Sequence, residues 1–181
     1  MGDYMNNIIE YDKNFNEAIF LGNVENIFAK YHYAQVFKDI DRIRHFISSD
    51  LQKQLEIRIN SLGDNIQFYD ELNLSQTKII KTELTDDKII IYVSTLIKYL
   101  DYVMDVNDKI ITGNNQQRVD KRFILKFEKL KEFEDMGEAR KCPGCGANID
   151  VNNNGKCEYC GTIYDLYKKD YILTDIKYYE E

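Results

Sequence analysis

Along the first part of the chain, apolar residues recur at steps of three and four positions. From Asn14 to Phe37 this spacing predicts one long helix with a single buried stripe. The stripe consists of Phe20, Val24, Ile27, Phe28, Tyr31 and Ala34. Lys38 and Asp39 interrupt the pattern, and Asp39 is expected to cap a short second helix. The apolar positions of that second helix are Ile40, Ile43, Phe46 and Ile47.

A third helix is predicted from the sequence Ser49-x-x-Gln52, which has the form of a capping box. Its buried face would consist of Leu51, Leu55, Ile59 and Leu62. Gly63 follows the last apolar residue and is expected to end the helix at the C′ position, where a left-handed backbone favours glycine. Three helices are therefore expected before any strand.

After Gly63 the pattern changes to stretches rich in β-branched and aromatic residues, which predict strands. The predicted strands are Leu74–Leu84, Lys88–Asp105, Arg118–Leu130 and Lys169–Tyr178. The second strand is apolar on both faces, so we expect it to lie centrally and to bend or bulge. Helices followed by an antiparallel meander predict an α+β fold with N-terminal helices packed on the sheet.

Four cysteines lie between the last two predicted strands. The sequence reads Cys142-Pro-Gly-Cys145-Gly and, eleven residues later, Cys157-Glu-Tyr-Cys160-Gly. Each C-x-x-C closes a tight turn that presents two thiolates, and two such turns complete a tetrahedron around Zn²⁺ at Zn–S distances of about 2.3 Å. Four protein ligands leave no open coordination position. The spacing therefore predicts one structural zinc per chain, with Cys142, Cys145, Cys157 and Cys160 as its ligands.

Other uses of these cysteines fit the sequence less well. A disulfide framework suits an oxidising compartment, whereas we expect no secretion signal from this sequence, and a redox C-x-x-C would not be expected twice. Iron remains an alternative, because sulfur ligands alone do not distinguish the metals. The prediction divides the chain into residues 1–136, a zinc-ribbon insertion at residues 137–165, and a final strand at residues 166–181 that returns to the sheet.

Several segments resemble one known family. They are F-L-x-x-V-x-x-I-F-x-K (20–30), K-D-I-D-x-I-R-x-F-I-S-x-x-L (38–51), D-Y-V-M-D (101–105) and the two cysteine motifs. Together they are similar to the bacterial Tim-forty-four-like proteins that carry a zinc ribbon. The resemblance implies a cone-shaped fold like that of nuclear transport factor two, with a curved sheet over helices. It also implies an association with membranes or transport.

Net charge and the length of apolar runs argue against two classes of protein, general nucleic-acid binders and membrane-spanning proteins. The 181 residues contain 24 basic and 31 acidic residues, and the resulting charge of −7 argues against a general nucleic-acid binder. The longest uncharged apolar run, Ile89–Ile97, is far shorter than the roughly 20 residues of a membrane-spanning helix. With no transmembrane segment or signal peptide in view, we expect a cytoplasmic protein, and the resemblance adds a place at the membrane periphery.

Cone-shaped folds often enclose a pocket between sheet and helices, and this gives a second set of candidates. The possible pocket residues are Tyr31, His32, Tyr92, Tyr99, Asp101 and Tyr102. A small-ligand site or an acid/base enzyme would need a carboxylate within hydrogen-bond reach of a tyrosine or histidine. The simpler interpretation is that these tyrosines fill the wide end of the cone and that His32 is a packed helix residue. We therefore expect no enzyme.

A basic run on the third predicted strand is the last candidate site. Residues 118–131 hold six basic and two acidic residues, and Arg118, Arg122 and Lys126 would share its polar face. Such a face suits an acidic peptide or an anionic lipid surface, and a zinc ribbon beside it offers the alternative of nucleic-acid binding. The four acidic residues that follow at 132–138 weaken the nucleic-acid alternative. The sequence thus predicts a non-catalytic zinc-binding module for a protein or peptide partner.

Overall fold

The structure, a computed structural model, describes residues 8–131, 147, 159 and 171–179. A helical turn at residues 8–11 comes first. The elements that follow are α2 (Glu17–Val36), η1 (Ile40–Arg42), η2 (Arg44–Phe46), α3 (Ser49–Ser61), β1 (Ile66–Leu84), β2 (Lys88–Met104), β3 (Ile110–Leu130) and β4 (Ile172–Tyr179). Helices precede the strands, so the predicted α+β class is confirmed. None of the helices among these residues is long and apolar enough to cross a membrane.

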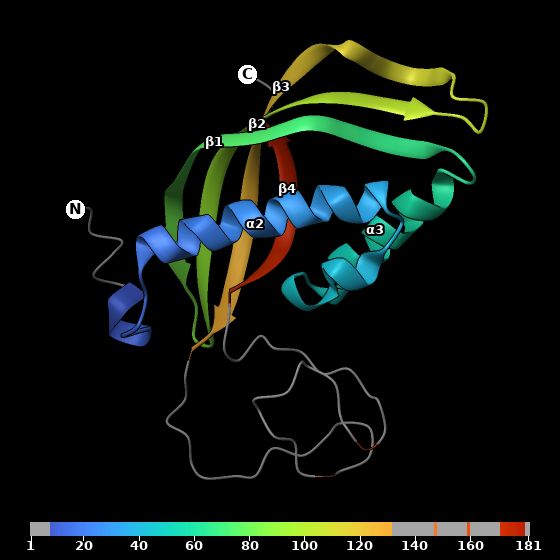
Figure 1. Cartoon of the computed structure of the whole chain (residues 1–181). Coiled ribbons are helices and arrows are strands. Elements are labelled where there is room, and N and C mark those ends of the chain that lie inside the picture. Colours follow the sequence, from blue (N-terminus) through green and yellow to red (C-terminus); the bar gives the residue numbers. More distant parts are fainter. Residues whose placement is uncertain (1–7, 132–146, 148–158, 160–170, 180–181) are drawn as a thin grey trace.

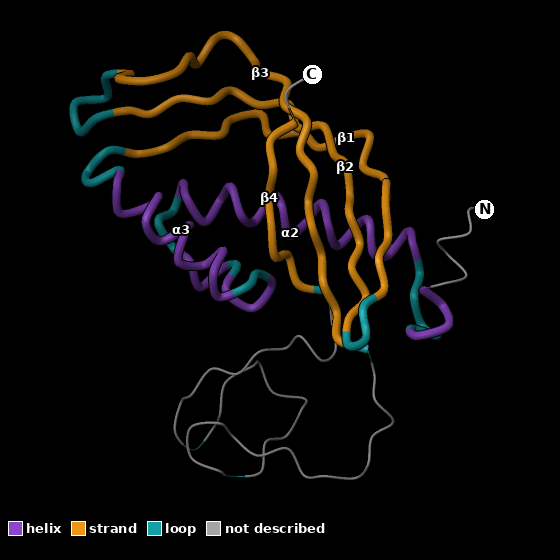
Figure 2. Tube along the Cα trace, turned by 180° about the vertical axis from the view of Figure 1, so that it is seen from behind, coloured by secondary structure: helices purple, strands orange, loops and turns teal. Residues whose placement is uncertain are grey.

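The four strands form one antiparallel sheet in the order β1-β2-β3-β4, which is the predicted meander. Helices α2 and α3 lie on the same side of this sheet, and α2 crosses the strands (Figures 1 and 2). The outer edge of β4 is covered in part, because Ile47 forms a parallel bridge with Leu173 and Ser48 N–H donates to Leu173 C=O at 2.9 Å. The helical region therefore closes one edge of the sheet as well as one face.

Two strands begin eight residues earlier than predicted. β1 starts at Ile66 rather than Leu74, and β3 starts at Ile110 rather than Arg118. The β3 extension is mostly polar and the β1 extension mixes apolar and polar residues without a regular sequence alternation, but Met104 at the end of β2 pairs with both Ile66 and Ile110. Backbone pairing with β2 thus extends both neighbours beyond the point where side-chain pattern indicates a strand.

The predicted central position of β2 is confirmed, while the expected irregularity lies in its neighbours. Between Asp70 and Asn73 and again between Ser75 and Lys78, β1 carries one more residue than the facing part of β2. Between Asn114 and Val119, β3 likewise carries extra residues opposite Tyr99–Asp101. Extra residues in one strand of a pair bend that strand and increase its twist, so β1 and β3 carry the irregularity on either side of β2.

The core forms where the apolar stripe of α2 meets the sheet. Phe20 packs edge-on against Phe127 with ring centroids 5.6 Å apart, and Phe28 packs against Phe123 at 5.2 Å. The β2 residues beneath are fully or almost fully buried: Ile89, Ile91, Val93, Ile97 and Tyr99. The apolar stripe of the helix and the apolar face of the strands, which follow from their different periodicities, are thus buried against each other.

Helix ends differ from the prediction in two places. The cap of α3 is Ser48 rather than Ser49: the Ser48 hydroxyl accepts from Leu51 N–H at 3.2 Å, and Gln52 donates to Arg44 C=O and Ile47 C=O instead of closing a capping box. The expected short second helix is two 3₁₀ turns, η1 and η2, although Asp39 caps the first as predicted. Gly63 follows α3 with φ +57°, which confirms its C′ position.

The chain leaves β3 and enters β4 at neighbouring positions, because Glu128 pairs with Ile172. The predicted last strand, Lys169–Tyr178, is observed at Ile172–Tyr179. All four cysteines, and with them the zinc site and the insertion at residues 137–165, lie outside the described residues. What the fold supplies is a pair of adjacent strand ends from which residues 132–170 depart and to which they return.

Candidate functional site

A polar cluster lies on the helix-covered face near the wide end of the sheet. The carboxylate of Asp101 accepts from Gln67 Nε2 at 3.0 Å and from Lys121 Nζ at 3.0 Å. The side chains of Lys121 and Asp101 remain 33% and 27% exposed, and the Lys121 ammonium also lies 5.4 Å from the centre of the Tyr99 ring. Both carboxylate oxygens therefore have partners at a position that water still reaches.

His32 lies beneath this cluster and is enclosed by aromatic rings. Its ring centroid is 4.7 Å from that of Phe28, 4.8 Å from Tyr69 and 5.8 Å from Tyr99. Nδ1 lies 2.9 Å from Phe28 C=O, and because a carbonyl only accepts, Nδ1 carries the proton. Burial lowers the pKa of His32 to about 4, against the smaller opposing effect of its backbone hydrogen bond. His32 is thus a neutral, packed side chain near pH 7.

Tyr69 connects the cluster to both helices. Its hydroxyl donates to Gln35 Oε1 on α2 at 3.0 Å and accepts from Arg58 Nη2 on α3 at 3.2 Å. Gln35 in turn donates to Tyr31 C=O at 3.2 Å. Burial raises the pKa of Tyr69, so its hydroxyl keeps the proton that this arrangement requires. The hydrogen bonds fix α2, α3 and β1 relative to one another.

The six pocket candidates do not share one site. Tyr31, His32, Tyr99 and Asp101 lie on the helix-covered face, whereas Tyr92 and Tyr102 lie on the opposite face, because successive side chains of β2 alternate. Tyr92 donates to Glu83 at 3.1 Å. Tyr102 stacks on Phe68 and donates to Asp70, and this hydrogen bond raises the pKa of Tyr102 to about 12. Including Tyr92 and Tyr102 in one pocket was therefore wrong.

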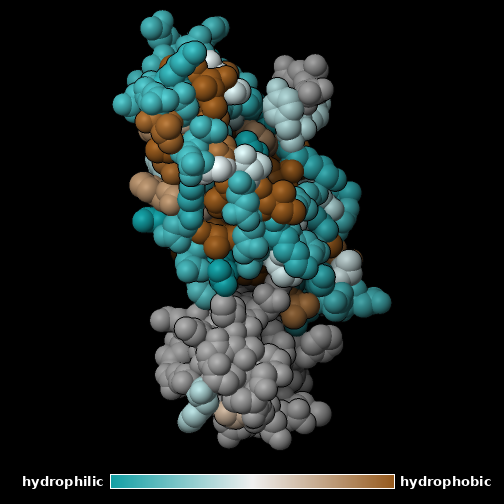
Figure 3. Space-filling model, turned by 90° about the vertical axis from the view of Figure 1, so that its right-hand side faces the viewer, coloured by the Kyte–Doolittle hydropathy of each residue, from teal (hydrophilic) through white to brown (hydrophobic). Residues whose placement is uncertain are grey.

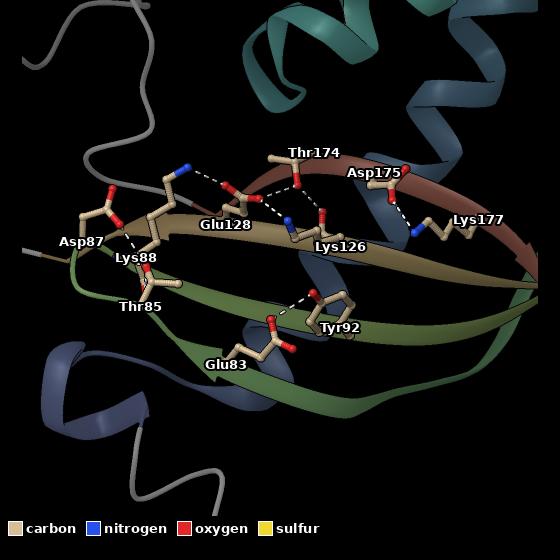
Figure 4. A network of polar contacts seen from close by, with 10 residues as sticks. All are labelled: Glu83, Thr85, Asp87, Lys88, Tyr92, Lys126, Glu128, Thr174, Asp175 and Lys177. Carbon is tan, nitrogen blue, oxygen red and sulfur yellow. Dashed lines mark hydrogen bonds and ion pairs between the residues drawn. The ribbon is translucent and has the colours of Figure 1, made fainter.

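The opposite face of the sheet carries its own network of charged groups, which Figure 4 shows. Glu128 accepts from Lys88 at 3.0 Å, from Lys126 at 2.6 Å and from the Thr174 hydroxyl at 3.3 Å. Burial by itself would raise the pKa of Glu128, but the hydrogen bonds from Lys126 and Lys88 outweigh burial and lower it. The network joins β2, β3 and β4 across the sheet.

The three cations of the predicted basic face all have partners on the sheet. Arg118 pairs with Glu71, and Lys126 pairs with Glu128. Arg122 donates to Ser94 Oγ at 3.2 Å and to Gln76 Oε1 at 2.7 Å. Two of the three cations thus have acidic partners: Glu128 lies on β3 itself, and Glu71 lies on β1, across β2. Glu71 is 47 positions away from Arg118 in the chain, so the sequence of β3 alone does not reveal that pair.

A surface hollow of about 310 Å³ lies where α2 ends and η1 begins, and it is lined by Lys30, Tyr33, Phe37 and Arg42. Tyr33 is 41% exposed and Phe37 is 57% exposed. The Arg42 guanidinium lies over the Phe37 ring, 4.5 Å from its centre. The sequence prediction did not include these residues. Tyr33 and Phe37 are four positions apart and outside the buried stripe of α2. This spacing predicts two neighbouring aromatic side chains on the exposed face, and it is the sequence signal by which they could have been found.

The hollow belongs to a surface of mixed character. Seen from the end of the molecule toward which α2 runs in Figure 1, separate groups of hydrophobic residues lie among hydrophilic ones (Figure 3).

Within the part of the chain that the structure describes, no three His, Cys, Asp or Glu side chains are grouped so as to hold a metal ion. Comparison with models of known protein families finds no match to this chain. Comparison with curated proteins finds no significant similarity either.

Proposed function

We propose that the chain is a zinc-stabilised, non-catalytic interaction module of the Tim-forty-four-like type that binds a protein or peptide partner. The observation that carries this proposal is the pairing of Glu128 with Ile172, which holds the two ends of the cysteine-containing segment side by side. A compact insertion needs adjacent ends, and a zinc ribbon is such an insertion. Ile172 and Leu173 are 2% and 0% exposed, so the return strand is anchored in the core.

The polar cluster is suited to a structural role and not to acid/base chemistry. Both oxygens of Asp101 have partners, and His32 donates to a backbone carbonyl rather than to a carboxylate. A general base needs a free lone pair near a substrate and a pKa close to the working pH, whereas the pKa of His32 is about 4 and that of Tyr99 is raised by burial. These groups are suited to holding the helices on the sheet.

The charges of β3 support a protein partner over nucleic acid. Nucleic-acid binding relies on several cations that are free to neutralise phosphates. Arg118 and Lys126 are instead paired with Glu71 and Glu128. An anionic lipid surface meets the same difficulty. We propose a cytoplasmic location, as expected from the sequence, and the resemblance adds an association with a membrane-associated or transport assembly.

Cross-linking and affinity capture from extracts of the source cells test this function. The tagged, zinc-loaded chain is compared with the tag alone and with a variant in which all four cysteines are replaced by serine. We expect the zinc-loaded chain to enrich a discrete protein and the serine variant to recover less of it. Failure to enrich any protein over the tag would overturn the proposal, and so would recovery that nuclease treatment abolishes.

A further inference from the structure

The hollow at the end of α2 contains a guanidinium whose orientation is fixed. Arg42 Nε donates to Asp39 Oδ2 at 3.1 Å, and Asp39 Oδ1 is itself engaged by Asp41 N–H at 3.1 Å. The Arg42 guanidinium also rests on the Phe37 ring. Within the described residues, its two terminal nitrogens have no hydrogen-bond acceptor. A guanidinium held in this way presents its two terminal nitrogens as a fork for a carboxylate, and part of its side-chain entropy is already lost.

Lys30 adds a second cation to the hollow. Its ammonium lies 4.6 Å from the centre of the Phe46 ring, and it makes no ion pair with any carboxylate in the described part of the chain. With Asp39 compensating Arg42, the hollow keeps one unbalanced positive charge in a chain whose net charge is −7. An acidic ligand is therefore attracted here and repelled by much of the remaining surface.

The walls of the hollow are aromatic. Tyr33 on α2 and Phe37 at its C-cap are exposed to solvent, with ring centroids 6.4 Å apart. Nothing in the packing of the core requires aromatic side chains at these positions. Exposed aromatic residues next to arginine are typical of the centres of protein-binding surfaces, where they supply most of the affinity.

We propose that this hollow docks a short acidic segment of a partner protein. A carboxylate of the segment binds Arg42 and Lys30, and an apolar or aromatic neighbour packs against Tyr33 and Phe37. The inference rests on the proposed function, since it names the surface by which the module takes its partner. A flat anionic membrane is the poorer occupant, because membrane binding needs several uncompensated basic residues on one face, whereas beside this hollow Arg42 is paired with Asp39 and Arg44 with Asp41.

The test starts from the full zinc-loaded chain and a phage-displayed library of random dodecapeptides. We expect the selected peptides to combine an acidic residue with an aromatic or aliphatic one. A selected peptide, labelled with fluorescein, is then titrated by anisotropy. Phe37→Ala and Arg42→Gln should each raise its Kd by about tenfold, as expected for residues at the centre of a binding surface.

Two control variants match these changes away from the hollow. Ile57→Ala removes an apolar side chain that is 70% exposed on α3, and Lys53→Gln removes a cation whose exposed partner is Asp50. Both should leave the Kd within about twofold, because changes outside the centre of an interface are nearly neutral. All four variants should keep the thermal transition of the unmodified chain, since these side chains lie on the surface.

Several outcomes would overturn the inference. They are a selection without enrichment, equal affinity of the peptide for the hollow variants and the controls, and binding of phosphatidylglycerol vesicles or inorganic phosphate with the same dependence on Arg42 and Phe37. The capture experiment separates the two proposals. A partner recovered equally by the unmodified chain and by Phe37→Ala contradicts the hollow alone, whereas no partner with either chain contradicts the proposed function.

Discussion

Lys129 and Asp12 form a buried ion pair across 117 positions of the chain, with Lys129 Nζ 2.8 Å from Asp12 Oδ2 and both side chains only 8% exposed. The Tyr171 hydroxyl donates to the same oxygen at 3.2 Å. Lys129 stands near the end of β3, and Tyr171 directly precedes β4. One carboxylate near the N-terminus therefore holds both strand ends between which the cysteine-containing segment runs.

Breaking this pair should cost far more than breaking a surface pair. Asp12→Asn leaves the Lys129 ammonium buried without a counter-charge, and we expect a loss of about 3–5 kcal/mol in the free energy of unfolding. Asp120→Asn is the matched control, because the Lys98–Asp120 pair is 44% and 53% exposed and should contribute less than about 1 kcal/mol. Urea titrations followed by circular dichroism measure both changes.

The double variant Asp12→Leu with Lys129→Met tests whether the loss caused by Asp12→Asn comes from the unpaired Lys129 charge or from changing the side chain at position 12. Replacing both charges by apolar groups should recover much of the stability that Asp12→Asn loses, because no uncompensated charge remains. Equal losses for Asp12→Asn and Asp120→Asn would show that water reaches the pair and that its burial contributes little.

His32 should make the stability depend on pH below neutrality. Burial lowers its pKa to about 4 in the folded chain, from 6.5 for an exposed histidine. Between these two values the unfolded chain binds the proton and the folded chain does not. The stabilisation is therefore complete above pH 6.5 and is lost as the pH falls toward 4, with a slope of up to about 1.4 kcal/mol per pH unit.

His32→Phe isolates this contribution, because it keeps an aromatic ring among Phe28, Tyr69 and Tyr99 but cannot bind a proton. Urea titrations at intervals from pH 7 to pH 5 should give a smaller slope for His32→Phe than for the unmodified chain. The range stays above the ordinary pKa of carboxyl groups, so Asp and Glu interfere little. Identical slopes for the two chains would contradict the prediction.

The pattern of neighbouring residues predicts the helices and strands, whereas the features that it does not predict depend on pairing between residues far apart in the chain. The stripe of α2 and the alternation in β3 follow from the identity of neighbouring residues, so both were predictable. The early parts of β1 and β3 were not, because Ile66 and Ile110 are strand residues only through their pairing with Met104. The partners of Arg118 and Lys129 come from distant elements, and no spacing along the chain indicates them.

Gly113 and Gly22 should respond oppositely to alanine. Gly113 has φ +80°, and a Cβ there would lie 2.0 Å from the backbone oxygen of Asp101, so Gly113→Ala must displace β2 or β3. A positive φ alone costs an alanine about 1 kcal/mol or more, and the backbone clash adds to that. Gly22 lies within α2, and an added Cβ meets nothing within 4 Å. Gly22→Ala should therefore stabilise the chain by about 0.5–1 kcal/mol.

Thermal unfolding measures this pair of variants directly. We expect Gly113→Ala to lower Tm and Gly22→Ala to raise it. Amide exchange at Asp101 and Tyr102 should accelerate in the first variant only. A Gly113→Ala chain with an unchanged Tm would show that β3 is not held against β2 at this point.

Zinc should stabilise the β3–β4 pairing without being needed for the rest of the sheet. The proposed zinc ribbon would act as a short connection between Leu130 and Ile172, whereas the same residues without metal would have to be closed as a long loop. Closing a flexible loop of this length costs on the order of 3 kcal/mol, and a ribbon that is already folded removes much of that cost. β4 depends on the closure, while β1 and β2 are joined by a tight turn at Asp86 and Asp87.

Metal analysis and amide exchange test this together. The purified chain should hold one zinc, and replacing the four cysteines by serine should lower Tm and speed exchange in β4 more than in β2. Asn153→Ser, a change in the same window outside the ligand set, should do neither. Fewer than about 0.5 zinc per chain would remove the site, and iron in its place would favour the other metal that four thiolates accept. A bound ion that holds the insertion together must shorten the connection between β3 and β4 and so raise the temperature of the thermal transition. An unchanged transition in the serine variant would therefore show that the metal has no structural role.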